Sequence, residues 1–423
     1  AFTTSNSYVQ NTWAALYNAI YDANDFIERL EAKMITYNTE DQALAKLYLA
    51  EARGLRALYY FELVRWYGHI ALITSTSESY KNPETFVQAD PTDVYKYIEN
   101  DLKYAIDVLP YATEDELRGD NKFRLSKGAV LGLLTRVYAT WAGAPLKDTS
   151  KWELAAQTAS LLINSGKHRL LDSYEQLWKN TCNGVWDPAE SLIEVSFFAP
   201  TVTGSASEDP CGRIGKWNGV AVSEIEGKRA SNSANVKVIH PFYLRWKEKE
   251  PNDLRRDLSI ANYKYAPNKI LEDPSAGQKN KQIYTPAKWD TEKYVEQHNS
   301  LLNKDKSNIN WYILRYADVL LLYAEALNEC HNGPTSDALA AINMVRRRGY
   351  GKPYLTGNSA IDLKTMSYED FKKAVQNERA YELAFEGQRR QDLVRWGIYY
   401  ESIVNTYKDI VGWYPEGNFI AYT

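Results

Sequence analysis

The chain has 423 residues, of which 44% are hydrophobic and 25% charged, and its 50 Lys and Arg against 54 Asp and Glu leave a net charge of −4. This length is too great for one ordinary hydrophobic core, so we expect two or three closely packed units. Without a basic excess no nucleic-acid partner is expected, and no apolar run approaches the ~18 residues of a membrane span.

Residues 1–165 are predicted to form helical hairpins. The spacing of apolar residues predicts two long helices within residues 8–67, and Gly68 is a stop signal for the second helix. Two carboxylates, Glu51 and Glu62, fall on the apolar stripe of that helix. Further helices are predicted at about 93–109, 125–142 and 151–164.

Residues 166–310 have a different character and are predicted to form an irregular, partly β region. The segment "ESLIEVSFFAP" (190–200) is β-like, and residues 201–235 are rich in Gly, Ser and Asn. Because loops longer than ~15 residues usually have a function, we expect this region to have a function of its own.

Helical hairpins are predicted again in residues 311–423. The hairpins are roughly 35–45 residues long, which is typical of tetratricopeptide-like repeats. The predicted fold class is therefore mainly α, a tetratricopeptide-like helical-hairpin scaffold with a large irregular, partly β insert. The predicted helices of this part are 311–330, 335–348, 368–387 and 389–406.

The segment "NERAYELAFEGQRRQDLVRWG" (377–397) places three glutamates four residues apart along one helical edge. Paired carboxylates catalyse glycoside hydrolysis, so catalysis is one interpretation. The helical phase, however, puts Glu378 on the apolar side, where a carboxylate needs an arginine partner. We therefore favour structural ion pairs over catalysis. The residues assigned to them are Glu378, Glu382, Arg389, Glu51 and Arg315.

Other catalytic or cofactor chemistry is not indicated. The sequence has no glycine-rich nucleotide motif, nucleophile elbow or zinc-protease motif. Its five histidines lack metal-ligand spacing, so neither cofactor nor metal is predicted. Three cysteines are too few for a disulfide framework, although Cys182 and Cys211 could pair in an exported protein.

Three long segments closely resemble hallmark segments of the SusD/RagB family. They are "AEARGLRALYYFELVRWYGHIALIT" (50–74), "NINWYILRYADVLLLYAEALNE" (308–329) and "FKKAVQNERAYELAFEGQRRQDLVRWG" (371–397), with weaker echoes at 190–200 and 252–263. The resemblance implies a non-enzymatic surface lipoprotein of the outer membrane in Bacteroidota. Such a protein binds oligosaccharide on an irregular region, which corresponds here to residues 166–310, and delivers it to a partner TonB-dependent, SusC-like transporter.

The chain departs from the family pattern at several points. The family's lipidated N-terminal Cys and its closing Pro-Ile-Pro pattern are not in this sequence, so a lipid anchor is expected from the resemblance alone. Gln388 and Arg390 stand where the family often has His and an aromatic residue.

The chain has 32 Tyr and 12 Trp but 11 Phe, a balance that suits half-buried, half-wet surfaces and is typical of proteins that stack on sugars. Platforms for sugar rings are expected in loops, with polar neighbours for the hydroxyl groups. Trp178 and Trp246 look like core residues. The predicted glycan-binding residues are Trp217, Asn218, Trp289, Trp186 and Tyr284, with Tyr80 and Asn82 added by the resemblance.

Two other classes of protein remain as alternatives. A helical α/α-toroid glycoside hydrolase or lyase would need two carboxylates in loops, such as Asp187 and Asp290. A tetratricopeptide scaffold that binds a protein or peptide would leave residues 166–310 without a role. The sequence does not name the glycan.

Overall fold

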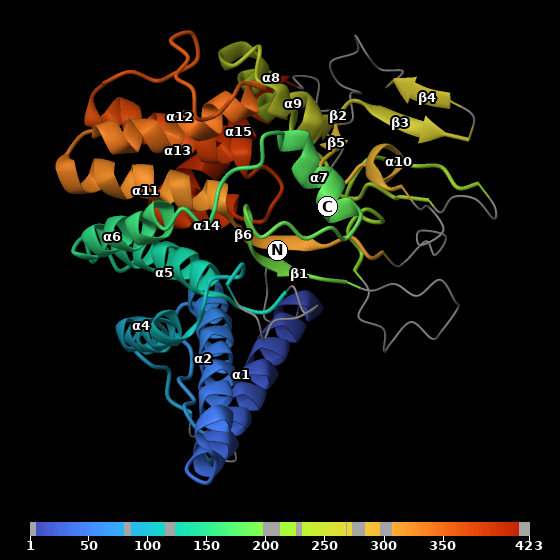
Figure 1. The fold of residues 1–423 in the computed structure, drawn as a ribbon. Coiled ribbons are helices and arrows are strands. Elements are labelled where there is room, and N and C mark those ends of the chain that lie inside the picture. Colours follow the sequence, from blue (N-terminus) through green and yellow to red (C-terminus); the bar gives the residue numbers. More distant parts are fainter. Residues whose placement is uncertain are drawn as a thin grey trace. The chain divides into compact units, whose positions relative to one another are not determined.

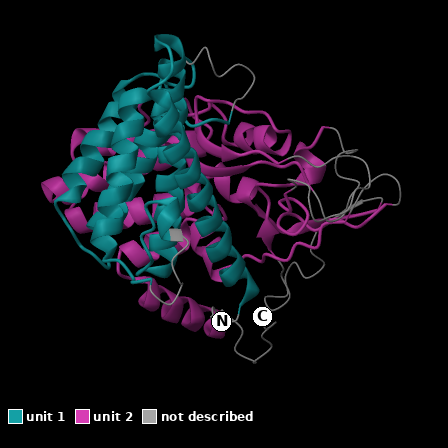
Figure 2. Ribbon diagram, turned by 90° about the horizontal axis from the view of Figure 1, so that it is seen from below, with its two compact units in different colours: residues 1–168 teal, residues 169–423 magenta. Residues whose placement is uncertain are grey.

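Figure 1 shows a computed structural model of the chain. It describes residues 6–79, 86–114, 123–197, 212–225, 231–267, 269–272, 284–296 and 307–413. The chain forms two compact units, residues 1–168 and residues 169–423 (Figure 2). The predicted segments 166–310 and 311–423 thus fall mainly in the second unit, and the assignment of ligand binding to 166–310 stays a prediction. Tyr80, Asn82 and Cys211 lie outside the described residues.

The first unit is a stack of helices in which each long helix packs on its neighbour in the chain. Four of these helices begin with a side-chain cap, since a side-chain oxygen accepts a hydrogen bond from a first-turn backbone N–H. The capping residues are Asn6, Asn38, Asp90 and Ser126. Its helices are α1 (Ser7–Met34), α2 (Thr39–Tyr67), α3 (Thr76–Ser79), α4 (Pro91–Val108), α5 (Lys127–Ala142) and α6 (Lys151–Asn164).

A buried arginine ties the first three long helices together. Arg56 of α2 donates to both carboxylate oxygens of Asp101 in α4, at 2.8 and 2.9 Å, and to Asn24 Oδ1 in α1 at 2.7 Å. Because the fork of the guanidinium is fully used, burial of this charge is compensated.

The second unit combines helical hairpins with three two-stranded antiparallel sheets. Its helices are α7 (Tyr174–Cys182), α8 (His240–Lys249), α9 (Leu254–Ser259), α10 (Thr291–Tyr294), α11 (Tyr316–His331), α12 (Ser336–Gly349), α13 (Tyr368–Glu382), α14 (Arg389–Arg395) and α15 (Tyr399–Trp413). The sheets pair β1 (Ser191–Val195) with β6 (Trp311–Arg315), β2 (Ile260–Ala261) with β5 (Thr285–Pro286), and β3 (Tyr263–Ala266) with β4 (Lys269–Glu272).

The predicted fold class is confirmed, but three predicted helices differ from those of the structure. The helix predicted from residue 311 begins at Tyr316, because Trp311–Arg315 is a strand that pairs with β1. The helix predicted over 368–387 ends at Glu382, where the chain turns through Phe385 with φ 67° and Gly387 with φ 77°. The helix predicted over 389–406 is divided into α14 and α15.

Aromatic side chains form much of the core of the second unit. Trp178 and Trp289 pack edge to face at 5.8 Å, and Trp246 stacks on Tyr381 at 4.7 Å. Trp178 and Trp246 are fully buried, as predicted from the sequence. Among the described residues, no helix has both the length and the apolar character needed to cross a membrane.

Candidate functional site

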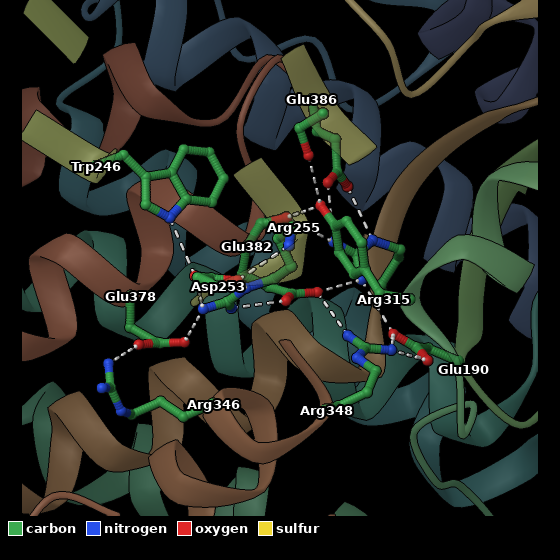
Figure 3. Close-up of polar contacts among 12 residues, drawn as sticks. Glu190, Trp246, Asp253, Arg255, Arg315, Arg346, Arg348, Glu378, Glu382 and Glu386 are labelled. Carbon is green, nitrogen blue, oxygen red and sulfur yellow. Dashed lines mark hydrogen bonds and ion pairs between the residues drawn. The ribbon is translucent and has the colours of Figure 1, made fainter. Parts of the chain in front are cut away.

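The glutamates of the 377–397 segment lie in a buried network of ion pairs in the second unit (Figure 3). Its buried part contains five cations and five carboxylates of the described chain, so the formal charges there balance. A sixth carboxylate, the partly exposed Glu250, pairs with Arg346 at the edge of the network. The cations are Arg255, Lys288, Arg315, Arg346 and Arg348, and the carboxylates are Glu190, Asp253, Glu378, Glu382 and Glu386.

Glu382, the last residue of α13, lies at the centre of the network. Its carboxylate accepts hydrogen bonds from Arg255 and Arg315 at 3.0 Å and from Arg348 at 2.6 Å. Burial raises the pKa of Glu382, but the three guanidinium groups, led by Arg348, outweigh burial and bring the pKa to about 2. A carboxyl held ionised in this way is unsuited to donate a proton as a general acid at neutral pH.

The other predicted ion pairs divide into two groups. Glu378 lies 2.7 Å from Arg255 and 2.8 Å from Arg346, and in the first unit Glu51 lies 2.8 Å from Arg124. Arg389 is different: it is exposed, donates to the Gln376 carbonyl at 3.0 Å and forms no ion pair among the described residues. Its predicted ion pair is therefore wrong, because α14 turns Arg389 toward the surface.

A lysine that the sequence did not single out completes the network. Lys288 is fully buried, donates to Glu386 at 2.6 Å and to the Glu382 carbonyl at 3.0 Å, and lies 4.4 Å from the centre of the Trp178 ring. Burial lowers its pKa to about 8, with Glu386 opposing the shift. No sequence pattern marked it, because "PAKWD" has no helical phase from which burial could be inferred.

The two carboxylates proposed for a hydrolase both have hydrogen-bond partners within the protein. Asp290 is fully buried, and its Oδ2 accepts hydrogen bonds from the hydroxyls of Tyr263 at 2.8 Å and Tyr265 at 3.0 Å. Asp187 Oδ1 accepts from the Ala189 N–H at 2.9 Å, as in a local turn. Asp290 therefore joins its segment to β3, whereas Asp187 stabilises its own turn.

Two of the predicted glycan platforms are core residues. Trp289 is 3% exposed and stacks on Trp311 at 5.2 Å, and Tyr284 is 6% exposed and stacks on Tyr243 at 4.5 Å. A ring without an exposed face cannot cover a sugar. The prediction is wrong for these residues. Their sequence neighbours are typical of loops, and the sequence does not show that other loops cover these segments.

Trp217 and Asn218, by contrast, lie half-buried in a surface turn, residues 212–219, which we call the tryptophan turn. Its first residue, Gly212, exchanges two backbone hydrogen bonds of 2.8 and 2.7 Å with Ser307. The carbonyl of Trp217 accepts from Asn235 N–H at 2.7 Å. Trp186 is also half-buried, in the connection between α7 and β1.

Two glycines hold the tryptophan turn against the core. Gly215 has φ 75° and Gly219 has φ 133°, which side chains other than glycine rarely adopt. A Cβ at Gly215 would lie 2.4 Å from Ile309 Cδ1, and one at Gly219 would lie 2.8 Å from the Trp289 carbonyl oxygen. The turn is therefore seated closely on the buried Trp289 segment, which makes it a preformed surface for Trp217.

The tryptophan turn also presents an arginine that was not predicted. Arg213 is exposed, and its guanidinium lies over the Trp217 ring, 4.6 Å from the ring centre. The spacing Arg-x-x-x-Trp within a glycine-containing turn was the available signal. Among the described residues, no His, Cys, Asp and Glu side chains cluster so as to hold a metal ion.

The fold and this geometry define a helical-hairpin scaffold with a buried ionic framework and an aromatic surface turn. The profile described as "SusD family" matches residues 232–415, and the profile described as "Starch-binding associating with outer membrane" matches residues 1–139. A solved structure of a SusD homolog from Bacteroides thetaiotaomicron is 59% identical with a TM-score of 0.93, over 97% of this chain and 79% of that chain. The chain belongs to the SusD family.

More distant relatives have names that refer to glycans or to the same family. A structure described as a laminarin binding SusD-like protein is 26% identical with a TM-score of 0.65, over 93% of this chain and 79% of that chain. A SusD-like protein of Bacteroides ovatus is 26% identical over 428 residues, which cover 94% of this chain and 67% of the relative.

Proposed function

We propose that the chain binds an oligosaccharide at the cell surface, without catalysis, and delivers it to a TonB-dependent transporter of the outer membrane. The observation that carries the proposal is the half-buried Trp217 on a rigid surface turn, in a member of the SusD family. Laminarin binding by a 26% identical relative supports the ligand class, and the outer-membrane description of the matching profile supports the location.

The proposed contact follows from the chemistry of sugars. A pyranose ring has an apolar C–H face that an indole ring covers, while its hydroxyls need polar partners. Trp217 supplies the ring, and the adjacent Asn218 supplies an amide. Because glycines 215 and 219 fix the turn, little conformational entropy is lost when the sugar binds.

Calorimetry with an oligosaccharide chosen from a glycan array tests this site. We expect Trp217→Ala to weaken binding by about 2 kcal/mol, roughly thirty-fold in Kd, with unchanged thermal unfolding. Trp13→Ala is the matched control, since Trp13 is 37% exposed in the first unit. If Trp217→Ala bound the oligosaccharide with the affinity of the native chain, Trp217 would not be part of the binding site.

Two further experiments test the remainder of the proposal. Incubation with the bound glycan should release no reducing ends, and steady release would favour a hydrolase. A tagged chain purified from outer membranes should carry a TonB-dependent transporter in a fixed ratio. Isolation of the chain without any such transporter would contradict the delivery step.

A further inference from the structure

Arg213 has no hydrogen-bond acceptor or ion-pair partner among the described residues, unlike most arginines of the second unit. Among the described residues, its side chain makes neither an ion pair nor a hydrogen bond, and its one recorded contact is with the Trp217 ring. Arginines of the same unit that donate to a carboxylate or a carbonyl oxygen are Arg169, Arg245, Arg255, Arg256, Arg315, Arg346, Arg347, Arg348, Arg379, Arg389 and Arg395.

Two described segments next to Arg213, residues 212–219 and 231–239, carry positive charge and no carboxylate. The tryptophan turn is hydrogen-bonded to residues 231–239 through Ser233 N–H to the Lys216 carbonyl at 3.0 Å and Asn235 N–H to the Trp217 carbonyl at 2.7 Å. Both segments contain cationic residues and neither contains Asp or Glu, although the whole chain has a net charge of −4. The cations of the two segments are Arg213, Lys216 and Lys237.

The charged groups packed behind these segments do not neutralise Arg213. Lys216 is buried, and Lys237 donates to the Ala234 carbonyl. Asp290, in the segment beneath the turn, directs its Oδ2 to the hydroxyls of Tyr263 and Tyr265. The positive charge at the surface of the turn is therefore that of Arg213, adjacent to the proposed sugar platform.

We infer that Arg213 and Trp217 together select an acidic saccharide, one whose sugar residues carry carboxylate or sulfate groups. This inference rests on the proposed function, because it specifies the ligand of the same site. The indole contacts the C–H groups of a sugar ring, and the five N–H donors of Arg213 meet the anionic group, which the planar guanidinium binds through two parallel hydrogen bonds.

Matched pairs of saccharides test the inference. Oligogalacturonide is compared with its carboxyl-reduced form, a chondroitin sulfate oligosaccharide with its desulfated form, and a laminarin oligosaccharide serves as the neutral probe. We expect the native chain to bind at least one acidic form about ten-fold or more tightly than its neutralised partner. The two pairs distinguish carboxylate from sulfate recognition.

Arg213→Gln should reduce this preference to about two-fold or less, while Arg213→Lys should retain part of it. The matched control is Arg389→Gln, because Arg389 is also exposed and lies over a tryptophan, 5.4 Å from the centre of the Trp396 ring. Thermal unfolding of each variant establishes that it is folded. Survival of the full preference in Arg213→Gln would overturn the inference.

The outcomes separate this inference from the proposed function. If neutral saccharides bind through Trp217 as tightly as acidic ones, the inference fails and the proposed function stands. If no saccharide of the array or of the matched pairs binds the native chain, the proposed function fails and the inference fails with it.

Discussion

An arginine lies over a tryptophan in two very different places in the second unit. Arg315 lies 5.7 Å from the centre of the Trp178 ring, and Arg213 lies 4.6 Å from the centre of the Trp217 ring. Arg315 is 1% exposed and is held by Glu190, Glu382 and Glu386. Arg213 is exposed, and its side chain has neither an ion pair nor a hydrogen bond among the described residues. In the core the arginine of the pair has carboxylate partners, and at the surface it has none among the described residues.

The difference shows how the environment decides the role of such a pair. In the dry interior an unpaired charge costs several kcal/mol, so the protein itself supplies the counter-charges. At the surface water solvates the guanidinium, so the protein need not supply a counter-charge and a ligand can provide it. The most densely charged region is therefore structural, and the sparsely charged turn is the candidate site.

The largest expected effect comes from truncating the tryptophan beneath the turn. Trp289→Ala should lower the free energy of unfolding by about 4 kcal/mol, because it leaves a cavity between Trp178 and Trp311. Guanidinium denaturation measures this, with Trp217→Ala expected to stay within about 1 kcal/mol of the native chain. If Trp289→Ala were as stable as the native chain but did not bind saccharide, Trp289 would be a binding residue and not a core residue.

Glu378→Ala should destabilise the second unit by about 3 kcal/mol, because it leaves Arg255 and Arg346 with less counter-charge in the core. Glu369→Ala, an exposed position in the same helix, is the control and should change stability by less than about 0.5 kcal/mol. The saccharide affinity of the folded Glu378→Ala fraction should be native. A lower saccharide affinity of the folded variant would show that the ion-pair network contributes to binding.

Glu194 provides a test of a buried carboxyl that receives hydrogen bonds without an ion pair. Ser191 Oγ donates to it at 2.6 Å and Asn310 Nδ2 at 2.8 Å, while burial raises its pKa to about 7 despite these bonds. The folded state thus keeps a proton that the unfolded state releases at lower pH, so stability contributed by this group is lost as pH rises through about 7.

Relative to Glu194→Gln, the native chain should therefore lose about 2 kcal/mol of stability between about pH 5 and about pH 7. Urea denaturation of both chains across this range measures the difference, which removes the contribution of all other titrating groups. Parallel pH profiles for the two chains would show that Glu194 titrates in the folded state as it does in the unfolded state.

The smallest expected effect is that of Arg389→Gln, which should change the free energy of unfolding by less than about 0.5 kcal/mol because Arg389 has no ion pair among the described residues. Differential scanning calorimetry measures it. A loss above about 2 kcal/mol would mean that the surface arginine stabilises the fold as the buried ones do.

Much of the helical scaffold could be predicted because helical phase is a local property of the sequence. The limits of α11 could not, because "WYILR" (311–315) is apolar enough for either a helix or a strand, and its pairing with β1 decides the outcome. Similarly, the phase of α13 predicted that Glu378 would face the packed side, but not which arginines would meet it.

The candidate site was predictable only in part. Trp217 was indicated by its position between glycines. Arg213 became a candidate only once the structure showed that its guanidinium lies over Trp217 without an ion pair among the described residues. Trp289 has a similarly loop-like sequence and is buried, because its exposure depends on segments 212–219 and 307–315 that are distant from it in the chain.

The ion-pair network also constrains the order in which the second unit folds. The contact between Arg348 and Glu190 joins residues 158 positions apart, and Tyr174 donates to the Glu382 carbonyl across 208 positions. Closing such long loops is entropically costly and slows folding. Residues near the start of the unit can therefore form these contacts only after α13 has been synthesised. A chain that ended before α13 would lack the glutamates that neutralise its buried arginines.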